Sequence, residues 1–477
     1  MKSSCRFSVI LTFLLGLTNL LSAFVYGQLV TPYQYDVDLL PASFHRQRRD
    51  SLRAQLPDSS IAIFFSNPIR NRSNDVDYVY HQDPNLYYFS GFRDPNAILV
   101  IFKEPFLWYS GSKVTEFLII QPPNVKDELW TGRMATIEDA EKVSGCTTII
   151  YSSDSSCLNL PYATFKKVLH LRLPQGVANN KNDHHELFDL LEQFKSFTAP
   201  DSVKTDDYLL QKIVARLRQL KSPEELQLLT KSIEMSVAAH LEMMQAVRPG
   251  MTEYEVEAVG EFGFYRRGAE DVGYPSICGS NENSCTLHYQ KNRKTLHAGD
   301  LLLLDMGAEY HGYSADITRT LPVSGTFTVQ QRTLYEIVLK AQEAGIRDCI
   351  AGNEFKNPHK SAFRIISEAL LKLGIASDED DVRRYFPHGT SHYLGLDVHD
   401  PGDYQPLQPG QVITVEPGIY IPAGSPCDPK WWNIGIRIED DVLITDNLPV
   451  VLSGNLPKKT SEIEKIIQDA QQNSRGK

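Results

Sequence analysis

Residues 301–320 read LLLLDMGAEYHGYSADITRT. The four leucines form an apolar run that is typical of a strand buried on both faces. The polar residues that follow indicate the turn of a β-hairpin. A turn centred on Tyr310 and His311 would place Asp305 and Asp316 directly opposite each other, and a turn one residue later would make them diagonal neighbours. Either register puts both carboxylates on one face, where they repel unless a cation intervenes or one of them is protonated.

Histidines gather in residues 387–400, which read PHGTSHYLGLDVHD. His388, His392 and His399 stand in this stretch of a chain that has 13 histidines in all. The glycines between them allow close backbone approach and unusual dihedral angles. A lone histidine is commonly structural, but three in a glycine-rich stretch indicate a functional site as readily as a structural one.

Two later strands also carry acids. Glu416 follows the apolar run VITV at residues 412–415, which Pro-Gly then ends. Residues 433–441 read NIGIRIEDD and alternate strictly, so the isoleucines share one face while Arg437 and Glu439 share the other. An arginine two residues from an acid on one strand face can hold a carboxylate with two hydrogen bonds. Each glutamate alone could be an edge-strand acid that faces water.

These residues together supply four carboxylates and one imidazole, namely Asp305, Asp316, Glu416, Glu439 and His392. The set suits hard divalent cations and favours Mn²⁺ over Mg²⁺ or Ca²⁺, while Zn²⁺ or Co²⁺ also fit. The negative charge of four carboxylates matches two divalent ions. Paired metals can lower the pKa of a shared water and stabilise both sides of a hydrolytic transition state.

Length and composition predict a globular protein of about two domains. The chain has 477 residues, of which 42% are hydrophobic and 22% charged. Its net charge is −11 and it has no Lys/Arg-rich block, which argues against nucleic acid as a partner. Apolar residues recur at helical spacing from about residue 206, and a helix start at residues 222–225, SPEE, places the domain boundary near residue 220.

The first residues are typical of a signal peptide. Lys2 and Arg6 precede an apolar run that ends at Gly27, a plausible site of cleavage. An uncleaved membrane anchor is the alternative, but the run is short and interrupted. We expect residues 1–27 to be removed, no stable membrane span to remain, and the mature protein to be secreted or periplasmic. In such an oxidising compartment Cys146 and Cys157 could close a short loop.

The quoted residues resemble the pita-bread metallopeptidases, a family that includes methionine aminopeptidase, prolidase and aminopeptidase P. Aspartate, aspartate eleven residues on, then histidine, glutamate and glutamate form the family's metal set, and all five are present. The stretches at residues 279–283, 316–320 and 388–392, together with residues 87–92, are most similar to aminopeptidase P. The implied fold class is α/β (α+β). It combines an N-terminal creatinase-like α/β domain (28–220) with a C-terminal pita-bread domain (221–477), a curved and mostly antiparallel sheet flanked by helices.

The resemblance also implies an activity, which is hydrolysis of the N-terminal Xaa-Pro bond of peptides by a hydroxide that bridges two metal ions. Glu416 would shuttle the proton, and His288 and His399 would bind the substrate carbonyl. Arg437 would orient an acidic ligand, while His388 and Tyr420 would bind substrate or support the metal ligands. Tyr420 is at least as readily a packed strand aromatic.

The family's N-terminal domain further implies a homo-oligomer, either a dimer or a tetramer. Trp130 corresponds to a position that reaches a neighbouring subunit's site in some members, although a buried core tryptophan is the favoured interpretation. Two other functions stay open. A prolidase would cleave only Xaa-Pro dipeptides, and a non-catalytic binding module on the same fold would not need all five ligands.

Overall fold

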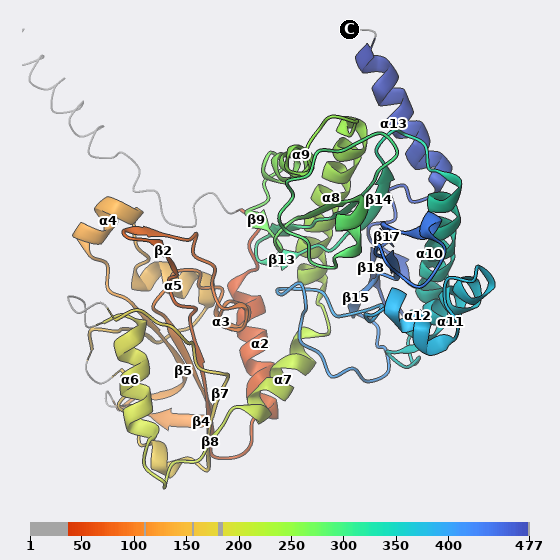
Figure 1. Cartoon of the computed structure of the whole chain (residues 1–477). Helices are drawn as coiled ribbons and strands as arrows, with labels where there is room; N and C mark the ends of the chain where they lie inside the picture. Colours follow the sequence, from red (N-terminus) through yellow and green to blue (C-terminus); the bar gives the residue numbers. More distant parts are fainter. Residues whose placement is uncertain (1–36, 109–110, 155–156, 180–184, 476–477) are drawn as a thin grey trace, which may run out of the picture. The chain divides into compact units, whose positions relative to one another are not determined.

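The structure is a computed structural model that describes residues 37–108, 111–154, 157–179 and 185–475 (Figure 1). The described chain forms two compact units that divide between Thr205 and Asp206. The predicted signal peptide lies outside the described residues. Within the described ranges, no helix is both long and apolar enough to cross a membrane.

The division falls upstream of the boundary predicted near residue 220. The helix α7 (Tyr208–Arg218) belongs to the second unit, because its last residue is buried there. The Arg218 guanidinium forms ion pairs with Asp397 and Asp400 of that unit. The helix start at residues 222–225 is confirmed, since Ser222 and Glu225 form a capping box at the start of α8.

The first unit is built on a six-stranded mixed sheet of order β6-β5-β4-β1-β7-β8. Its strands are β1 (Ser60–Phe65), β4 (Ile98–Leu107), β5 (Lys113–Ile120), β6 (Ile149–Tyr151), β7 (Lys167–His170) and β8 (Thr205–Asp206), with β2 (Asn71–Ser73) and β3 (Val76–Asp77) as a separate pair. The β1–β4 and β4–β5 pairs are antiparallel, whereas β1–β7 and β5–β6 are parallel. Every residue of β1 is buried, as its apolar sequence predicts.

The helices of this unit are α2 (Ala42–Gln55), α3 (Pro84–Ser90), α4 (Val125–Thr131), α5 (Ile137–Ser144) and α6 (Leu187–Thr198). Helix α4 has no buried residue, and its Trp130 is 85% exposed. The interpretation of Trp130 as a core residue is therefore wrong. Cys146 and Cys157 are both buried free thiols, so the short disulfide between them is not formed.

In the described part of the second unit, all strand pairs are antiparallel. The strands are β9 (Asp271–Val272), β10 (Ile277–Ser280), β11 (Leu301–Asp305), β12 (Ala308–Tyr310), β13 (Tyr313–Ser314), β14 (Thr318–Pro322), β15 (Val412–Val415), β16 (Gly418–Ile421), β17 (Ile434–Arg437), β18 (Asp440–Leu443) and β19 (Val450–Val451). They form the sheets β10-β11-β14, β13-β12-β9, β15-β18-β19 and β16-β17.

The hairpin at residues 301–320 adopts the later of the two predicted registers. His311 and Gly312 both have positive φ, +48° and +82°, as the two central residues of a type I′ turn require. Asp305 consequently pairs with Thr318, so Asp305 and Asp316 are diagonal neighbours. The backbones approach closely beside the acids, because a Cβ on Gly307 would stand 1.9 Å from the Ala315 carbonyl oxygen.

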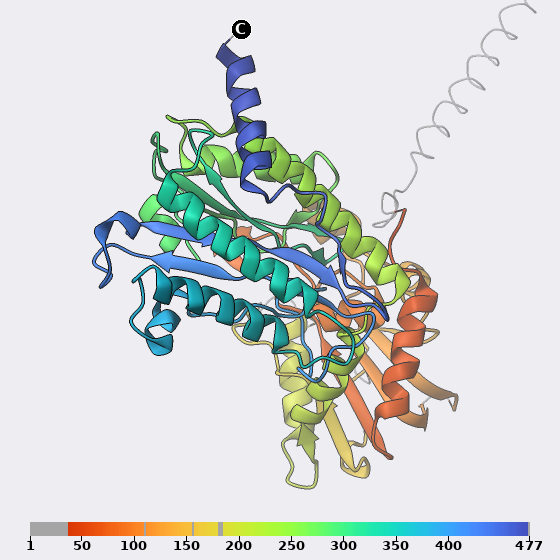
Figure 2. The same ribbon diagram turned by 90° about the vertical axis from the view of Figure 1, so that its right-hand side faces the viewer.

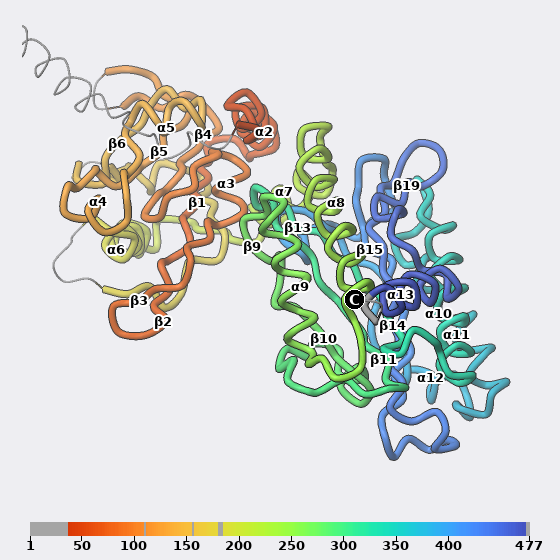
Figure 3. Tube along the Cα trace, turned by 90° about the horizontal axis from the view of Figure 1, so that it is seen from above, coloured from red at the N-terminus to blue at the C-terminus, as the bar shows by residue number. Residues whose placement is uncertain are grey.

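The helices of the second unit are α7, α8 (Pro223–Ala246), α9 (Glu253–Tyr265), α10 (Val329–Arg347), α11 (Asn357–Lys372), α12 (Glu379–Tyr385) and α13 (Thr460–Arg475). Helices α10 and α11 lie side by side along the strands (Figure 2), and α8 lies beside α9 (Figure 3).

Candidate metal centre

Each of the four acids stands where a strand is interrupted. Asp305 ends β11 just before β12, and Asp316 lies between β13 and β14. Glu416 lies between β15 and β16, and Glu439 between β17 and β18. The Glu439 amide also donates to the Thr318 carbonyl (3.1 Å), which joins the two broken hairpins. Breaks at matching positions of neighbouring strands therefore bring all four carboxylates to one place.

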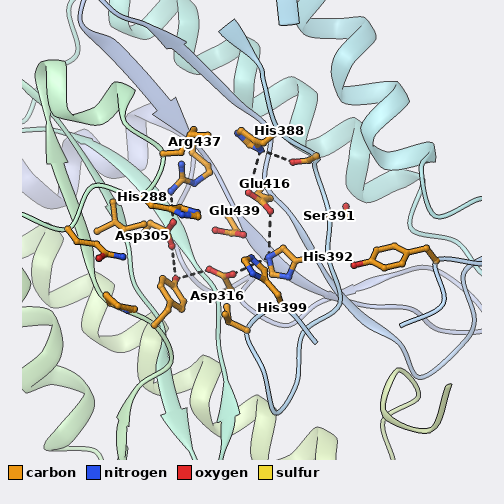
Figure 4. Close-up of a pocket in the computed structure, with 18 residues that line it drawn as sticks. His288, Asp305, Asp316, His388, Ser391, His392, His399, Glu416, Arg437 and Glu439 are labelled. Carbon is orange, nitrogen blue, oxygen red and sulfur yellow. Dashed lines mark hydrogen bonds and ion pairs between the residues drawn. The ribbon is translucent and has the colours of Figure 1, made fainter. Parts of the chain in front are cut away.

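His392 completes this cluster (Figure 4). Its Nε2 lies 3.3 Å from Asp316 Oδ2 and 3.6 Å from Glu416 Oε1. Ligand atoms of Asp316, His392 and Glu439 all lie within 4.8 Å of one another. On the other side of the His392 ring, Nδ1 donates to the Tyr393 carbonyl (2.9 Å), which fixes the ring with Nε2 toward the acids. This is the orientation that a metal-binding imidazole needs.

Asp305 is held by two side chains. The Arg437 guanidinium donates to Asp305 Oδ2, and the Tyr274 hydroxyl lies 2.6 Å from Asp305 Oδ1. The same hydroxyl lies 2.7 Å from Asp316 Oδ1, so it links the two aspartates. Burial and the two aspartates raise the pKa of Tyr274 well above its usual value, which keeps the hydroxyl protonated as a donor. Our sequence reasoning missed Tyr274.

The electrostatics of the cluster are those of crowded, buried acids. Burial raises the pKa of Glu416 to about 7. Burial and the neighbouring acids Asp316 and Glu416 raise the pKa of Glu439 well above its usual value. Asp316 is the exception: burial would raise its pKa, but His392 outweighs burial and lowers it. Burial also raises the pKa of Asp305, although the Arg437 guanidinium acts to lower it. Three of the four acids are therefore harder to ionise than usual until positive charge is brought near them.

This donor set fits divalent metal ions. Carboxylate oxygens and one oriented imidazole are the ligands such ions take, and added positive charge relieves the repulsion among the acids.

The cluster lines a cavity of about 520 Å³, and the predicted histidines share it. The His399 ring packs edge-on against His392, with ring centroids 4.4 Å apart. His288 also lines the cavity, in a segment fixed by the buried Glu253, which accepts hydrogen bonds from Ser280, Asn283, Tyr289 and Lys294. The cavity also has an apolar wall of Pro275, Ile277, Leu287 and Val398.

His388, Tyr420 and Arg437 form a chain behind Glu416. Arg437 Nη1 donates to the Tyr420 hydroxyl (2.9 Å), and His388 Nε2 lies 2.9 Å from the same hydroxyl. His388 Nδ1 donates to the Gly389 carbonyl (2.7 Å), so Nε2 accepts from Tyr420. The structure thus brings every predicted site residue to this cavity or directly behind it, whereas the role of each stays a prediction.

Comparison with known proteins agrees with this geometry. The model of "Metallopeptidase family M24" matches residues 227–446, and that of "Aminopeptidase P, N-terminal domain" matches residues 45–160. The Xaa-Pro aminopeptidase of Escherichia coli (strain K12) is 36% identical over 440 residues, covering 88% of this chain and 97% of that protein. Xaa-Pro aminopeptidase 3 of Homo sapiens is 34% identical over 427 residues, covering 86% and 81%.

A solved structure is equally similar. Aminopeptidase P from E. coli with the inhibitor Pro-Leu superposes with a TM-score of 0.80 at 34% identity, covering 91% of this chain and 99% of that chain. The fold and the site thus define a metallopeptidase with an N-terminal creatinase-like α/β unit and a C-terminal pita-bread catalytic unit, which confirms the predicted fold class. The chain belongs to metallopeptidase family M24, in the branch that carries the aminopeptidase P N-terminal domain.

Proposed function

We propose that this protein is a metal-dependent aminopeptidase that hydrolyses the N-terminal Xaa-Pro bond of peptides. The observation that carries the proposal is the cavity in which Asp305, Asp316, His392, Glu416 and Glu439 converge beside His288 and His399. Relatives named Xaa-Pro aminopeptidase, similar over nearly their whole length, support the choice of substrate.

The five converging residues would hold the metal ions, which supply positive charge that activates water and polarises a peptide carbonyl. Glu416 lines the same cavity, where its carboxylate could accept a proton from the attacking water and pass it to the departing proline nitrogen. His288 and His399 stand on the cavity wall, where their N–H groups can donate to the carbonyl oxygen as negative charge develops.

The charges of the cavity favour an aminopeptidase over a dipeptidase. A dipeptide carries its free carboxylate on the proline itself, so a prolidase needs a cation close to the proline subsite. Among the described residues that line the cavity, Arg437 is the one arginine and there is no lysine. Its guanidinium is occupied by Asp305, Tyr420 and Thr318. A longer peptide, whose carboxylate lies farther from the metal centre, is therefore the better substrate.

The test is an assay of Arg-Pro-Pro against Gly-Pro with added Mn²⁺, with and without a chelator. We expect release of arginine from Arg-Pro-Pro, little cleavage of Gly-Pro, and loss of activity with the chelator. Exclusive cleavage of Gly-Pro would instead make the protein a prolidase. Cleavage of neither peptide by metal-loaded protein would refute the assignment to proline peptides.

We propose Mn²⁺ as the native metal, because a set rich in carboxylates with a single imidazole suits it better than Zn²⁺ or Co²⁺. Activity of protein reconstituted with each ion in turn, together with the metal content of protein purified without added metal, tests this. Higher activity with Zn²⁺ or Co²⁺ at matched occupancy would contradict the choice.

We also propose that the chain is exported and that it assembles with copies of itself. The charged and apolar pattern of residues 1–27 supports export, and N-terminal sequencing should find a mature chain that begins at Gln28.

Assembly is supported by α4, whose Val125, Leu129 and Trp130 are 81–85% exposed. Sedimentation should show a dimer or tetramer. If α4 lies in the contact between subunits, Trp130→Ala should shift the association equilibrium toward monomer.

A further inference from the structure

His399 reaches the cavity from a segment that has an unusual anchor. Among the described residues, the His399 ring makes no hydrogen bond of its own, and its ring contact is the edge-on packing against His392. Its position must therefore be set by the backbone that carries it. The next residue, Asp400, is 3% exposed and points away from solvent, into the interior of the second unit.

The Asp400 carboxylate is held by two cations that come from far along the chain. Arg218 donates to Asp400 Oδ1, and Lys221 Nζ donates to Asp400 Oδ2 (2.8 Å). Arg218 also donates to Asp397 Oδ2 (2.7 Å) in the same segment. The side chains of Arg218, Lys221 and Asp400 are each 2% exposed or less. We call these three residues the Asp400 clamp.

The backbone of the segment is wound around this carboxylate. The Asp400 amide donates to the Tyr393 carbonyl (2.9 Å), and the Asp397 amide donates to Asp400 Oδ1 (3.2 Å). A Cβ on Gly395 would stand 2.7 Å from Asp400 Oδ2, so a side chain there would displace the carboxylate. The Ser314 amide donates to the Gly395 carbonyl (2.9 Å), which ties the segment to the strand just before Asp316.

Stability alone does not account for the Asp400 clamp. Burying three ionised groups costs desolvation energy that their attraction recovers only in part, and well-packed apolar residues at such sites often give equal or greater stability. The clamp fixes the position of the Asp400 carboxylate, which an apolar core could not do, because directed hydrogen-bond donors hold each of its two oxygens. The residue whose position this fixes in the cavity is His399.

We propose that Asp400, held by Arg218 and Lys221, is a positioning residue that sets where His399 stands in the cavity. The inference rests on the proposed function for its catalytic consequence, but the position of the ring can be measured without any substrate. A displacement of about 1 Å at a catalytic group can lower turnover by as much as about 100-fold, so a clamp of this kind has a measurable effect.

The first measurement uses full-length, metal-free protein with isotope-labelled histidine. The NMR signal of the His399 imidazole should shift or broaden in Asp400→Asn and in Lys221→Met. Lys221→Met replaces the ammonium with an apolar side chain of similar length and leaves Arg218 to pair with Asp400. Because removing one partner of a buried ion pair costs stability, circular dichroism first checks that each variant is folded. The control is Glu116→Gln, which breaks the buried pair between Arg49 and Glu116 in the first unit and should leave the His399 signal unchanged.

The second measurement is a double-mutant cycle on the metal-loaded protein with Arg-Pro-Pro. Asp400→Asn should lower kcat by about 10- to 100-fold, with metal content unchanged and a small change in KM. In the His399→Ala background the same substitution should change kcat by less than about twofold, because its effect acts through His399. Glu116→Gln should lower the melting temperature while kcat stays at the wild-type value.

Two results would overturn the inference. One is an unchanged His399 signal in folded Asp400→Asn and Lys221→Met. The other is a pair of losses that multiply in the double variant, which would show that Asp400 acts independently of His399. Wild-type protein that cleaves no proline peptide, yet shows the expected NMR shifts, would instead refute the proposed function and leave the positioning role of the clamp supported.

Discussion

Replacing Tyr274 with phenylalanine tests how the protein holds its metal centre. The substitution removes one oxygen and keeps the ring. That oxygen lies 2.6 Å from Asp305 Oδ1 and 2.7 Å from Asp316 Oδ1, and both carboxylates belong to the predicted metal set. Because a phenol carries a single hydrogen, it can donate to only one of them at a time, so one charge-assisted hydrogen bond is lost.

Such a bond is worth about 1.5–3 kcal/mol when the acceptor is ionised and the site is buried. Since 1.4 kcal/mol corresponds to a factor of ten, metal affinity should fall by roughly 10- to 100-fold, the range found when partners of metal ligands are removed. The loss should appear as a weaker dissociation constant for Mn²⁺, and saturating metal should restore most of the activity.

The assay is a titration with Mn²⁺ in a chelator buffer, followed by activity and by bound metal. Tyr289→Phe is the matched control, because its hydroxyl donates to Glu253 (2.9 Å), which is not a predicted ligand. The control should bind Mn²⁺ as the wild type does. An unchanged dissociation constant in Tyr274→Phe would refute the view that this phenol helps to hold the two aspartates.

Three further predictions follow from the same structure. His399→Ala should lower kcat far more than metal content, and equal losses in both would remove its catalytic assignment. Metal uptake at pH 7 should release about two or three protons, because metal ligands bind in their deprotonated forms. Burial raises the pKa of Glu416 to about 7 and of Glu439 well above its usual value, and the hydrogen bond to Asp316 raises the pKa of His392 to about 9 against the effect of burial. Calorimetry in buffers of different ionisation enthalpy should detect this release, and its absence would contradict the raised pKa values. Burial lowers the pKa of His45 from 6.5 to about 4, so the folded state binds fewer protons than the unfolded state in this range. Roughly 3 kcal/mol of the free energy of unfolding should therefore be lost as the pH falls from 6.5 to 4. Thermal melts of His45→Gln should show a weaker pH dependence than the wild type, and an equally steep dependence would contradict this.

The metal ligands could be predicted from the sequence because their signals are local. Each acid stands at the end of an apolar run or on an alternating strand, and such a position is hard to explain for a solvated side chain. The uncertain register of the hairpin did not matter, since both turns keep Asp305 and Asp316 on one face. The positive φ of His311 and Gly312 decides between them, and that conformation follows from strand twist rather than from residue type alone.

The residues that support the site could not be predicted in this way. Tyr274 meets Asp305 and Asp316 across 31 and 42 positions, and Arg218 meets Asp400 across 182. No spacing rule relates residues so far apart, because their meeting depends on how whole strands and helices pack. The prediction that Trp130 is a buried core residue failed for a related reason. Tryptophan is buried on average, but exposure depends on what covers its helix, and within the described chain nothing covers α4.

The charge balance of the cavity explains why the cluster calls for metal ions. Arg437 neutralises one acid, Asp305, and His392 stabilises the ionised form of another, Asp316. Glu416 shares His392 at 3.6 Å, and Glu439 accepts a hydrogen bond from the neutral Thr318 hydroxyl (2.7 Å), yet the pKa values of both are raised. Burial raises the pKa of Asp305 as well, so Arg437 and His392 together do not supply enough positive charge for all four acids. A fold that buries four converging acids at strand breaks, yet supplies one arginine for them, is balanced only when divalent cations bring the remaining positive charge.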